Sequence, residues 1–206
     1  DRIEIQGVPD LGGARHRIIP DRIEAGTLLV AGAITGGDVT VTGVIPAHLS
    51  RVVATLEETG SRLEVESDWV RVQGRTPPRP TTVTTAVFPG FPTDMQAQFM
   101  ALLGLADGFS RITETIFENR FMHVAELCRM GARITTVGAT ALVQGVSHYQ
   151  GAPVMATDLR ASASLVLAGL AARGGTSVSR VYHLDRGYER LEVKLRQLGA
   201  RIERRQ

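Results

Sequence analysis

The chain has 206 residues, of which 43% are hydrophobic and 21% are charged, values that are ordinary for a globular protein and exclude an intrinsically disordered one. Its formal net charge of +2 is too small to indicate nucleic-acid binding, and no apolar run reaches the ~20 residues that span a bilayer. The single cysteine, Cys128, excludes an internal disulfide and fits a reducing compartment such as the cytoplasm. Because the sequence begins at Asp1 rather than at Met, we expect a fragment or a processed product.

Two short strands are the first predicted elements. They have the sequences IEIQGV and ARHRII and are joined by a turn at residues 9–13, which contains one proline and two glycines. We expect this strand pair, within residues 1–19, to find a partner on a sheet edge, either of its own chain or of a second copy. Otherwise its isoleucines would stay in water.

Three helices without a polar stripe follow. Asp21, Asp94 and Asp158 each precede a run of small and apolar residues, with the sequences RIEAGTLLVAGAI, MQAQFMALLGLA and LRASASLVLAGLAA. An aspartate in this position can cap a helix by accepting hydrogen bonds from its free N–H groups. A helix that is apolar all round must be covered on every side, so we expect all three in the interior.

A second pattern recurs in phase with the first. Amphipathic segments end at Gly60, Gly131 and Gly199, at intervals of about 70 residues, and each glycine is followed by a strand-like run. We therefore predict an α/β fold of three β-α-β-α-β(β) repeats, at about 20–80, 81–151 and 152–206. The apolar helices would lie inside and the sheets outside, which makes an inside-out α/β barrel from residue 20 to residue 206.

Three equivalent repeats bring the starts of the apolar helices to one end of the domain, where helix N-termini favour an anion. Arg120, Arg160 and Arg186 fall near these starts, and the guanidinium group binds carboxylate or phosphate bidentately. Periodicity alone favours the alternative that Arg120 and Arg186 are solvated loop charges. Asp94 is likewise either a general base or a helix cap, and Asp158 has the same ambiguity.

A metal site has weak support. His183 and Asp185 would share one strand face, with His123 elsewhere in the sequence, but no cluster of cysteines or carboxylates completes a ligand shell. We expect neither a metal nor a cofactor. Cys128 is expected to be a small buried residue of an outer helix rather than a nucleophile.

Four segments together resemble a known family. FPTDMQAQ, TETIFENRFMH, MATDLRASASLVLAGLAA and YHLDRGYER are similar to the C-terminal half of the enolpyruvyl transferases that act on UDP-N-acetylglucosamine, and the resemblance runs from RIEIQGV to LGARIER. It implies transfer of enolpyruvate from phosphoenolpyruvate to the sugar 3-hydroxyl with release of phosphate, at the start of peptidoglycan synthesis. It also implies two inverted barrels with the substrates in the cleft between them.

The resemblance implies a role for each candidate site residue. Asp94 would contact the 3-hydroxyl as the base, Asp158 would stand near the reacting centre, and Ile116 and Phe117 would line the nucleotide-sugar site. Arg120 and Arg160 would bind the phosphoenolpyruvate carboxylate, and Arg186 would bind its phosphate. For the loop arginines, the resemblance outweighs the reading as solvated charges.

The family's Lys-Asn pair and its reactive-cysteine loop belong to the half that this sequence lacks, and Cys128 does not match that loop. Residues 1–19 resemble the closing strands of the missing N-terminal domain. We therefore expect no turnover by this chain alone. Two other classes stay open from the sequence: a stand-alone module that binds a nucleotide sugar or another anion, and a nucleic-acid-binding module, for which the small basic excess is the weak support.

Overall fold

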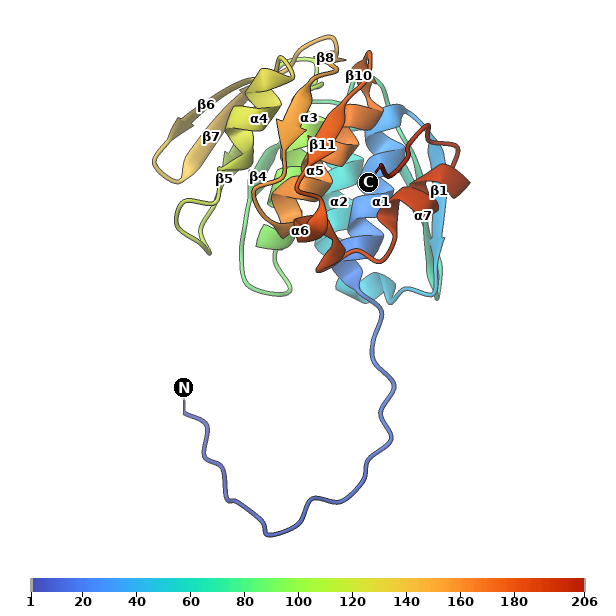
Figure 1. The fold of residues 1–206 in the computed structure, drawn as a ribbon, viewed down its shortest axis with the longest axis vertical. Coiled ribbons are helices and arrows are strands. Elements are labelled where there is room, and N and C mark those ends of the chain that lie inside the picture. Colours follow the sequence, from blue (N-terminus) through green and yellow to red (C-terminus); the bar gives the residue numbers. More distant parts are fainter. Residues whose placement is uncertain (1, 206) are drawn as a thin grey trace.

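The N-terminal segment stands apart from the rest of the fold. The computed structural model describes residues 2–205, and residues 2–20 form no helix or strand and extend away from the body of the chain (Figure 1). Their apolar side chains are exposed, with Ile3 at 87% and Leu11 at 90%. The two strands predicted here are therefore not formed in the single chain, because a strand needs a partner and no sheet edge pairs with this segment.

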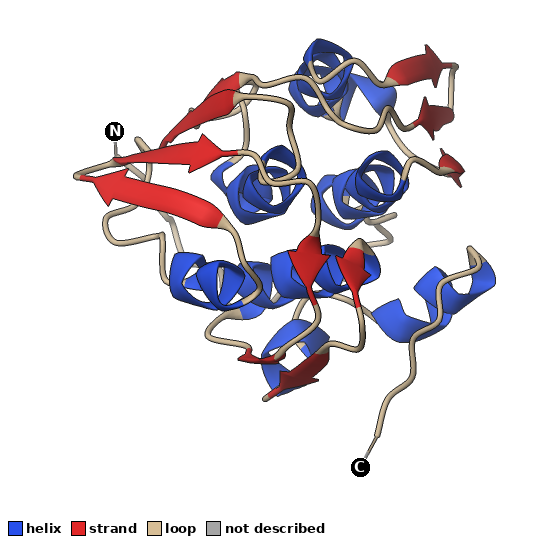
Figure 2. Cartoon of the chain, turned by 90° about the horizontal axis from the view of Figure 1, so that it is seen from above, coloured by secondary structure: helices blue, strands red, loops and turns tan. Residues whose placement is uncertain are grey.

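Three buried helices form the centre of the molecule. They are α1 (Arg22–Thr35), α3 (Gln96–Leu103) and α5 (Leu159–Leu170), and each contacts the other two. Every residue of α3 is buried, as the absence of a polar stripe predicts. In the view from above, helices occupy the middle and groups of strands lie on different sides of them (Figure 2).

Two sheets, one antiparallel and one mixed, lie within the first two predicted repeats. The first sheet has the order β1-β3-β2 and contains β1 (Asp38–Thr42), β2 (Arg62–Val65) and β3 (Trp69–Gln73). The second has the order β4-β5-β7-β6, and its strands are β4 (Thr82–Thr84), β5 (Phe109–Thr113), β6 (Arg133–Val137) and β7 (Thr140–Gln144). In this sheet β4 pairs with β5 in parallel, whereas β5 and β6 both pair with β7 antiparallel.

Two short parallel pairs follow in the described residues, one joining the end of the second predicted repeat to the third and one within the third. One joins β8 (Tyr149–Gln150) to β10 (Ala172–Arg173), and the other joins β9 (Pro153–Met155) to β11 (Ser177–Ser179). The strand predicted after Gly199 is absent from the described residues, because no neighbouring strand offers its backbone groups a partner there.

The outer helices end as the sequence predicts. They are α2 (Ser50–Glu58), α4 (His123–Arg129) and α7 (Leu191–Gln197). The glycine beyond each has a left-handed backbone, with φ of 88° at Gly60, 90° at Gly131 and 96° at Gly199. Shorter helical turns cover Pro46–His48 and Thr93–Met95, and α6 covers Tyr182–Asp185. No helix within residues 2–205 has the length and apolarity to cross a membrane.

Candidate functional site

Asp94 is held between two arginines. It lies in the short helical turn Thr93–Met95 that leads into α3, and its side chain is 36% exposed. Its Oδ1 accepts a hydrogen bond from Arg120 Nη2 at 2.7 Å, and its Oδ2 accepts one from Arg160 Nη2 at 3.3 Å. The structure thus brings two arginines, 40 residues apart in the sequence, to one carboxylate, although periodicity alone favoured Arg120 as a solvated loop charge.

Of the two alternatives for Asp94, the structure contradicts the helix cap. The carboxylate makes no capping hydrogen bond to α3, whose first residue follows Met95. In the bonds to the two guanidinium groups both partners carry a charge, whereas a backbone N–H is neutral. The carboxylate thus faces the cationic groups instead of the backbone of its own helix.

Asp158 and Asp21 do act as caps. Asp158 Oδ1 accepts hydrogen bonds from the N–H of Arg160 at 2.8 Å and of Ala161 at 2.9 Å, at the start of α5. Asp21 Oδ1 accepts one from Ile23 N at 2.7 Å. Both side chains thereby satisfy N–H groups that the first helical turn leaves free.

The two arginines at Asp94 are oriented by aromatic rings as well. Arg120 lies 4.8 Å from the ring centre of Phe117, and Arg160 lies 5.4 Å from that of Tyr188. Arg160 Nη1 is buried without a hydrogen-bond partner among residues 2–205. This guanidinium therefore has one donor that no group of the described residues satisfies.

The other predicted residues have looser surroundings. Ile116 and Phe117 are exposed and line a hollow of about 780 Å³ together with Arg120. Arg186 directly follows α6, is exposed, and forms no ion pair within the described part of the chain. The structure does not bring Arg186 into hydrogen-bonding contact with Asp94, Arg120 or Arg160.

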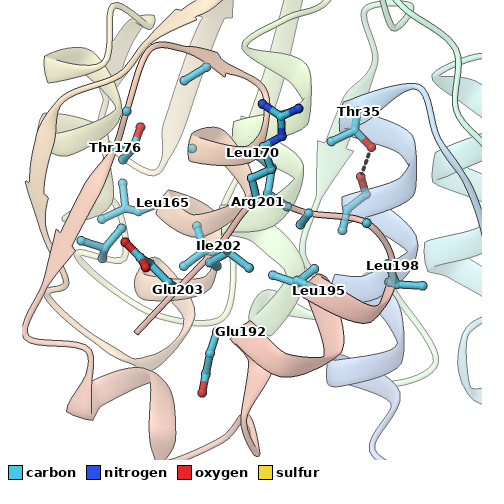
Figure 3. Close-up of a pocket in the computed structure, with 18 of the residues that line it drawn as sticks. Thr35, Leu165, Leu170, Thr176, Glu192, Leu195, Leu198, Arg201, Ile202 and Glu203 are labelled. Atoms are coloured by element: carbon cyan, nitrogen blue, oxygen red, sulfur yellow. Dashed lines mark hydrogen bonds between the residues drawn. The ribbon is translucent and has the colours of Figure 1, made fainter. Parts of the chain in front are cut away.

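A larger cavity, of about 1070 Å³, lies away from these residues. It is bordered by α1, α5, α7 and the C-terminal segment, with Leu165, Leu195 and Ile202 among its apolar side chains (Figure 3). It contains none of the predicted site residues, whereas the arginine–aspartate cluster brings three of them, Asp94, Arg120 and Arg160, into contact. We therefore assign the candidate site to that cluster.

A buried histidine sits beside the cluster. His123, the first residue of α4, is 2% exposed, and burial lowers its pKa from 6.5 to about 4. The Asp158 carboxylate opposes this shift, whereas the Arg120 guanidinium adds to it. The imidazole is therefore neutral near pH 7.

The structure corrects two expectations, the strand placement of His183 and Asp185 and the burial of Cys128. His183 and Asp185 lie in α6 rather than on a strand, and Asp185 pairs with Arg204. Across residues 2–205, no three His, Cys, Asp or Glu side chains gather as ligands. Cys128 is exposed instead of buried, because it lies on the outward face of α4.

Two sets of buried polar residues were not predicted from the sequence: the pair Thr27 and Gln98, and Glu114. Thr27 of α1 and Gln98 of α3 both reach the hydroxyl of Tyr188, at 2.9 and 3.2 Å, and Gln98 Nε2 also donates to the carbonyl oxygen of Asp94 at 2.9 Å. Polar residues inside otherwise apolar helices were the signal that could have found them. The second group is Glu114, a buried carboxylate directly after β5.

Similarity to known proteins decides the family. The family model described as EPSP synthase (3-phosphoshikimate 1-carboxyvinyltransferase) matches residues 1–195. This chain belongs to the EPSP synthase family. A relative in this family, the UDP-N-acetylglucosamine 1-carboxyvinyltransferase of Anaeromyxobacter sp. (strain K), is 62% identical over 204 residues, which are 99% of this chain and 48% of the relative.

Further members show the same relation. The protein of that name from Rhodopseudomonas palustris (strain BisB18) is 59% identical, over 98% of this chain and 48% of its own length. The chain thus spans about half the length of the curated relatives that it matches. The crystal structure of the enolpyruvyl transferase NikO from Streptomyces tendae matches 90% of the chain and 44% of its own, with a TM-score of 0.78 and 34% identity. An EPSP synthase from Acinetobacter baumannii, at 20% identity and a TM-score of 0.62 over 79% of the chain and 39% of its own, shows the shared EPSP synthase fold.

Proposed function

We propose that this chain is the C-terminal half of an enolpyruvyl transferase that transfers enolpyruvate from phosphoenolpyruvate to the 3-hydroxyl of UDP-N-acetylglucosamine and releases phosphate. The observation that carries the proposal is the Asp94 carboxylate held by Arg120 and Arg160 beside the hollow lined by Ile116 and Phe117. The relatives that are about 60% identical and carry this activity in their names support the choice of acceptor.

The residues have the chemistry that such a reaction needs. The 3-hydroxyl oxygen forms a bond to C2 of phosphoenolpyruvate while Asp94 takes the hydroxyl proton as general base, and C3 receives a proton from an acid of the other half. The tetrahedral intermediate then loses phosphate from C2 and a proton from C3, which restores the double bond. Both charged groups of phosphoenolpyruvate need cationic partners.

The family resemblance supports one partner for each of these side chains. Arg120 and Arg160 bind the phosphoenolpyruvate carboxylate, and Arg186, exposed and without an ion pair in residues 2–205, binds its phosphate. Asp158, at the start of α5, stands near the reacting centre while it caps that helix. No metal or cofactor is required for these steps.

The domain organisation is part of the proposal. Residues 20–206 form one inverted barrel of three repeats, and residues 1–19 pair with the N-terminal domain, which closes the cleft from the other side. The extended segment at residues 2–20, whose apolar side chains are exposed, supports a partner outside this chain. The protein acts in the cytoplasm on the first committed step of peptidoglycan synthesis, and thereby serves cell-wall growth, cell shape and division.

An acceptor comparison tests this function. The two-domain protein that contains this chain is given phosphoenolpyruvate with either UDP-N-acetylglucosamine or shikimate 3-phosphate, and phosphate release is measured. We expect release with the nucleotide sugar alone. Release only with shikimate 3-phosphate would refute the acceptor, and release with neither would refute the transferase in favour of a binding module.

A further inference from the structure

Glu114 is a buried carboxylate with four hydrogen-bond donors. It directly follows β5 and is 3% exposed. Its Oε1 accepts from Thr85 Oγ1 at 2.9 Å and from the N–H groups of Ile116 at 2.9 Å and Phe117 at 3.2 Å, and its Oε2 accepts from Thr93 Oγ1 at 2.8 Å. A carboxylate offers about four acceptor positions, so Oε1 with three donors is fully used and Oε2 with one donor is partly used.

The four donors come from three separate segments. Thr85 follows β4, Thr93 precedes α3, and the two N–H groups belong to the loop after β5. Burial of a carboxylate is costly unless hydrogen bonds replace its water shell. The three segments can satisfy Glu114 only in one arrangement relative to one another.

One of these bonds leads directly to the candidate site. The Thr93 hydroxyl donates to Glu114 and accepts from Arg120 Nη1 at 2.8 Å, while Arg120 Nη2 donates to Asp94 at 2.7 Å. An ionised carboxylate only accepts hydrogen bonds, so Glu114 fixes the direction of the Thr93 hydroxyl. With its proton committed to Glu114, the Thr93 oxygen presents lone pairs to Arg120.

The other bonds lead to the wall of the hollow. Glu114 Oε1 accepts hydrogen bonds from the backbone N–H groups of Ile116 and Phe117, the residues proposed to line the nucleotide-sugar site. Phe117 in turn lies under the Arg120 guanidinium. The same carboxylate therefore holds the acceptor wall and the arginine that faces Asp94.

We propose that Glu114 is a positioning residue that holds the Ile116–Phe117 loop and the Arg120–Asp94 pair in register, so that the acceptor hydroxyl and phosphoenolpyruvate meet at the reacting distance. This inference rests on the proposed function. Misplacement of reacting groups by about 1 Å can cost on the order of 10²-fold in rate. Two substitutions separate the link from Glu114 through Thr93 to Arg120 from the link to the Ile116–Phe117 loop.

Thr93→Val removes the hydroxyl at nearly constant volume and breaks the link from Glu114 to Arg120. The donors of Glu114 Oε1 stay in place. In the two-domain protein, we expect kcat to fall roughly tenfold to hundredfold and KM for phosphoenolpyruvate to rise, with KM for UDP-N-acetylglucosamine within about twofold of wild type. Thr93→Ser keeps a hydroxyl and should recover most of the loss. Glu114→Gln replaces one acceptor oxygen with a donor and should disturb both Arg120 and the Ile116–Phe117 loop. The KM values for phosphoenolpyruvate and for UDP-N-acetylglucosamine should therefore both rise.

Ser110→Ala is the matched control. Ser110 lies on β5, is 2% exposed, and its Oγ accepts a hydrogen bond from Thr81 N at 3.2 Å, away from Asp94 and Arg120. Its loss should lower the melting temperature and leave the kinetic constants unchanged. A merely structural Glu114 would behave in the same way.

The outcomes are distinct. Kinetic constants within about twofold of wild type for Thr93→Val and Glu114→Gln, with lowered melting temperatures alone, would overturn the inference and leave the proposed function intact. If Glu114→Gln does not fold, Thr93→Val decides by itself, since the inference requires its selective effect on phosphoenolpyruvate. A wild-type protein that transfers no enolpyruvate would overturn the proposed function and this inference together.

Discussion

Lowering the pH from about 8 to about 4.5 should destabilise this chain through His123. Burial holds its pKa at about 4, compared with 6.5 in the unfolded chain. Between these values the unfolded state binds the proton and the folded state does not, so the free energy of unfolding falls as the pH falls. The stabilisation is fully present above pH 6.5 and is lost progressively toward pH 4.

The size of the effect follows from the two pKa values. One pKa unit corresponds to about 1.4 kcal/mol, so about 3.5 kcal/mol is at stake, of which roughly 2.5 kcal/mol is lost by about pH 4.5. This is a large share of the stability of an ordinary domain, which is about 5–15 kcal/mol. Carboxylates titrate over the same range, and a variant comparison must therefore isolate the histidine.

Urea unfolding of wild type and His123→Gln across this pH range provides the comparison. The wild type should lose roughly 2.5 kcal/mol more than the variant, because glutamine does not titrate. His16→Gln, which changes a histidine of the exposed N-terminal segment, is the control and should follow the wild type. If the free energy of unfolding depends on pH equally in wild type and in His123→Gln, the conclusion that burial lowers the pKa of His123 is refuted.

Three further predictions concern the site, a helix cap and the N-terminal segment. In the two-domain protein, Asp94→Asn should lower kcat by ~10²–10⁴-fold, with much less effect on binding of UDP-N-acetylglucosamine; a kcat within a few-fold of wild type would show that the carboxylate only tethers the arginines. Asp158→Ala should lower the free energy of unfolding by about 1–2 kcal/mol, because two N–H groups of α5 lose their acceptor, and an unchanged urea midpoint would contradict this. By hydrogen exchange, the amides of residues 2–8 and 14–19 should exchange without protection in dilute solution, because the structure gives them no backbone partner. Protection that appears only at high concentration would indicate pairing with a second copy, and protection in dilute solution would contradict the structure.

Local signals in the sequence were enough to predict the helices. The apolar run after Asp21 and the left-handed glycine at Gly60 each act within a few residues, and both are confirmed. The meeting of Arg120 and Arg160 agrees with the family resemblance, which assigns both to one carboxylate, whereas periodicity alone favoured a solvated loop charge at Arg120.

The sequence predictions were wrong or incomplete where a residue's partners lie far away in the sequence. Asp94 is spaced as a helix cap, but guanidinium groups 26 and 66 residues away in sequence take its carboxylate. Glu114 resembles an ordinary polar residue at a strand end, and its four donors come together only in the folded chain. The runs at 2–20 and after Gly199 have strand-like composition but no pairing partner, and composition does not supply one.

Recombination of the two halves tests the central claim most directly. This chain alone, the N-terminal half alone and an equimolar mixture are each given phosphoenolpyruvate and UDP-N-acetylglucosamine, and phosphate release is followed. If one wall of the active site is Asp94 with its arginines and the other wall lies in the missing half, neither half should turn over and the mixture should. Turnover by this chain alone would contradict the claim. So would an inactive mixture whose parent two-domain protein is inactive as well.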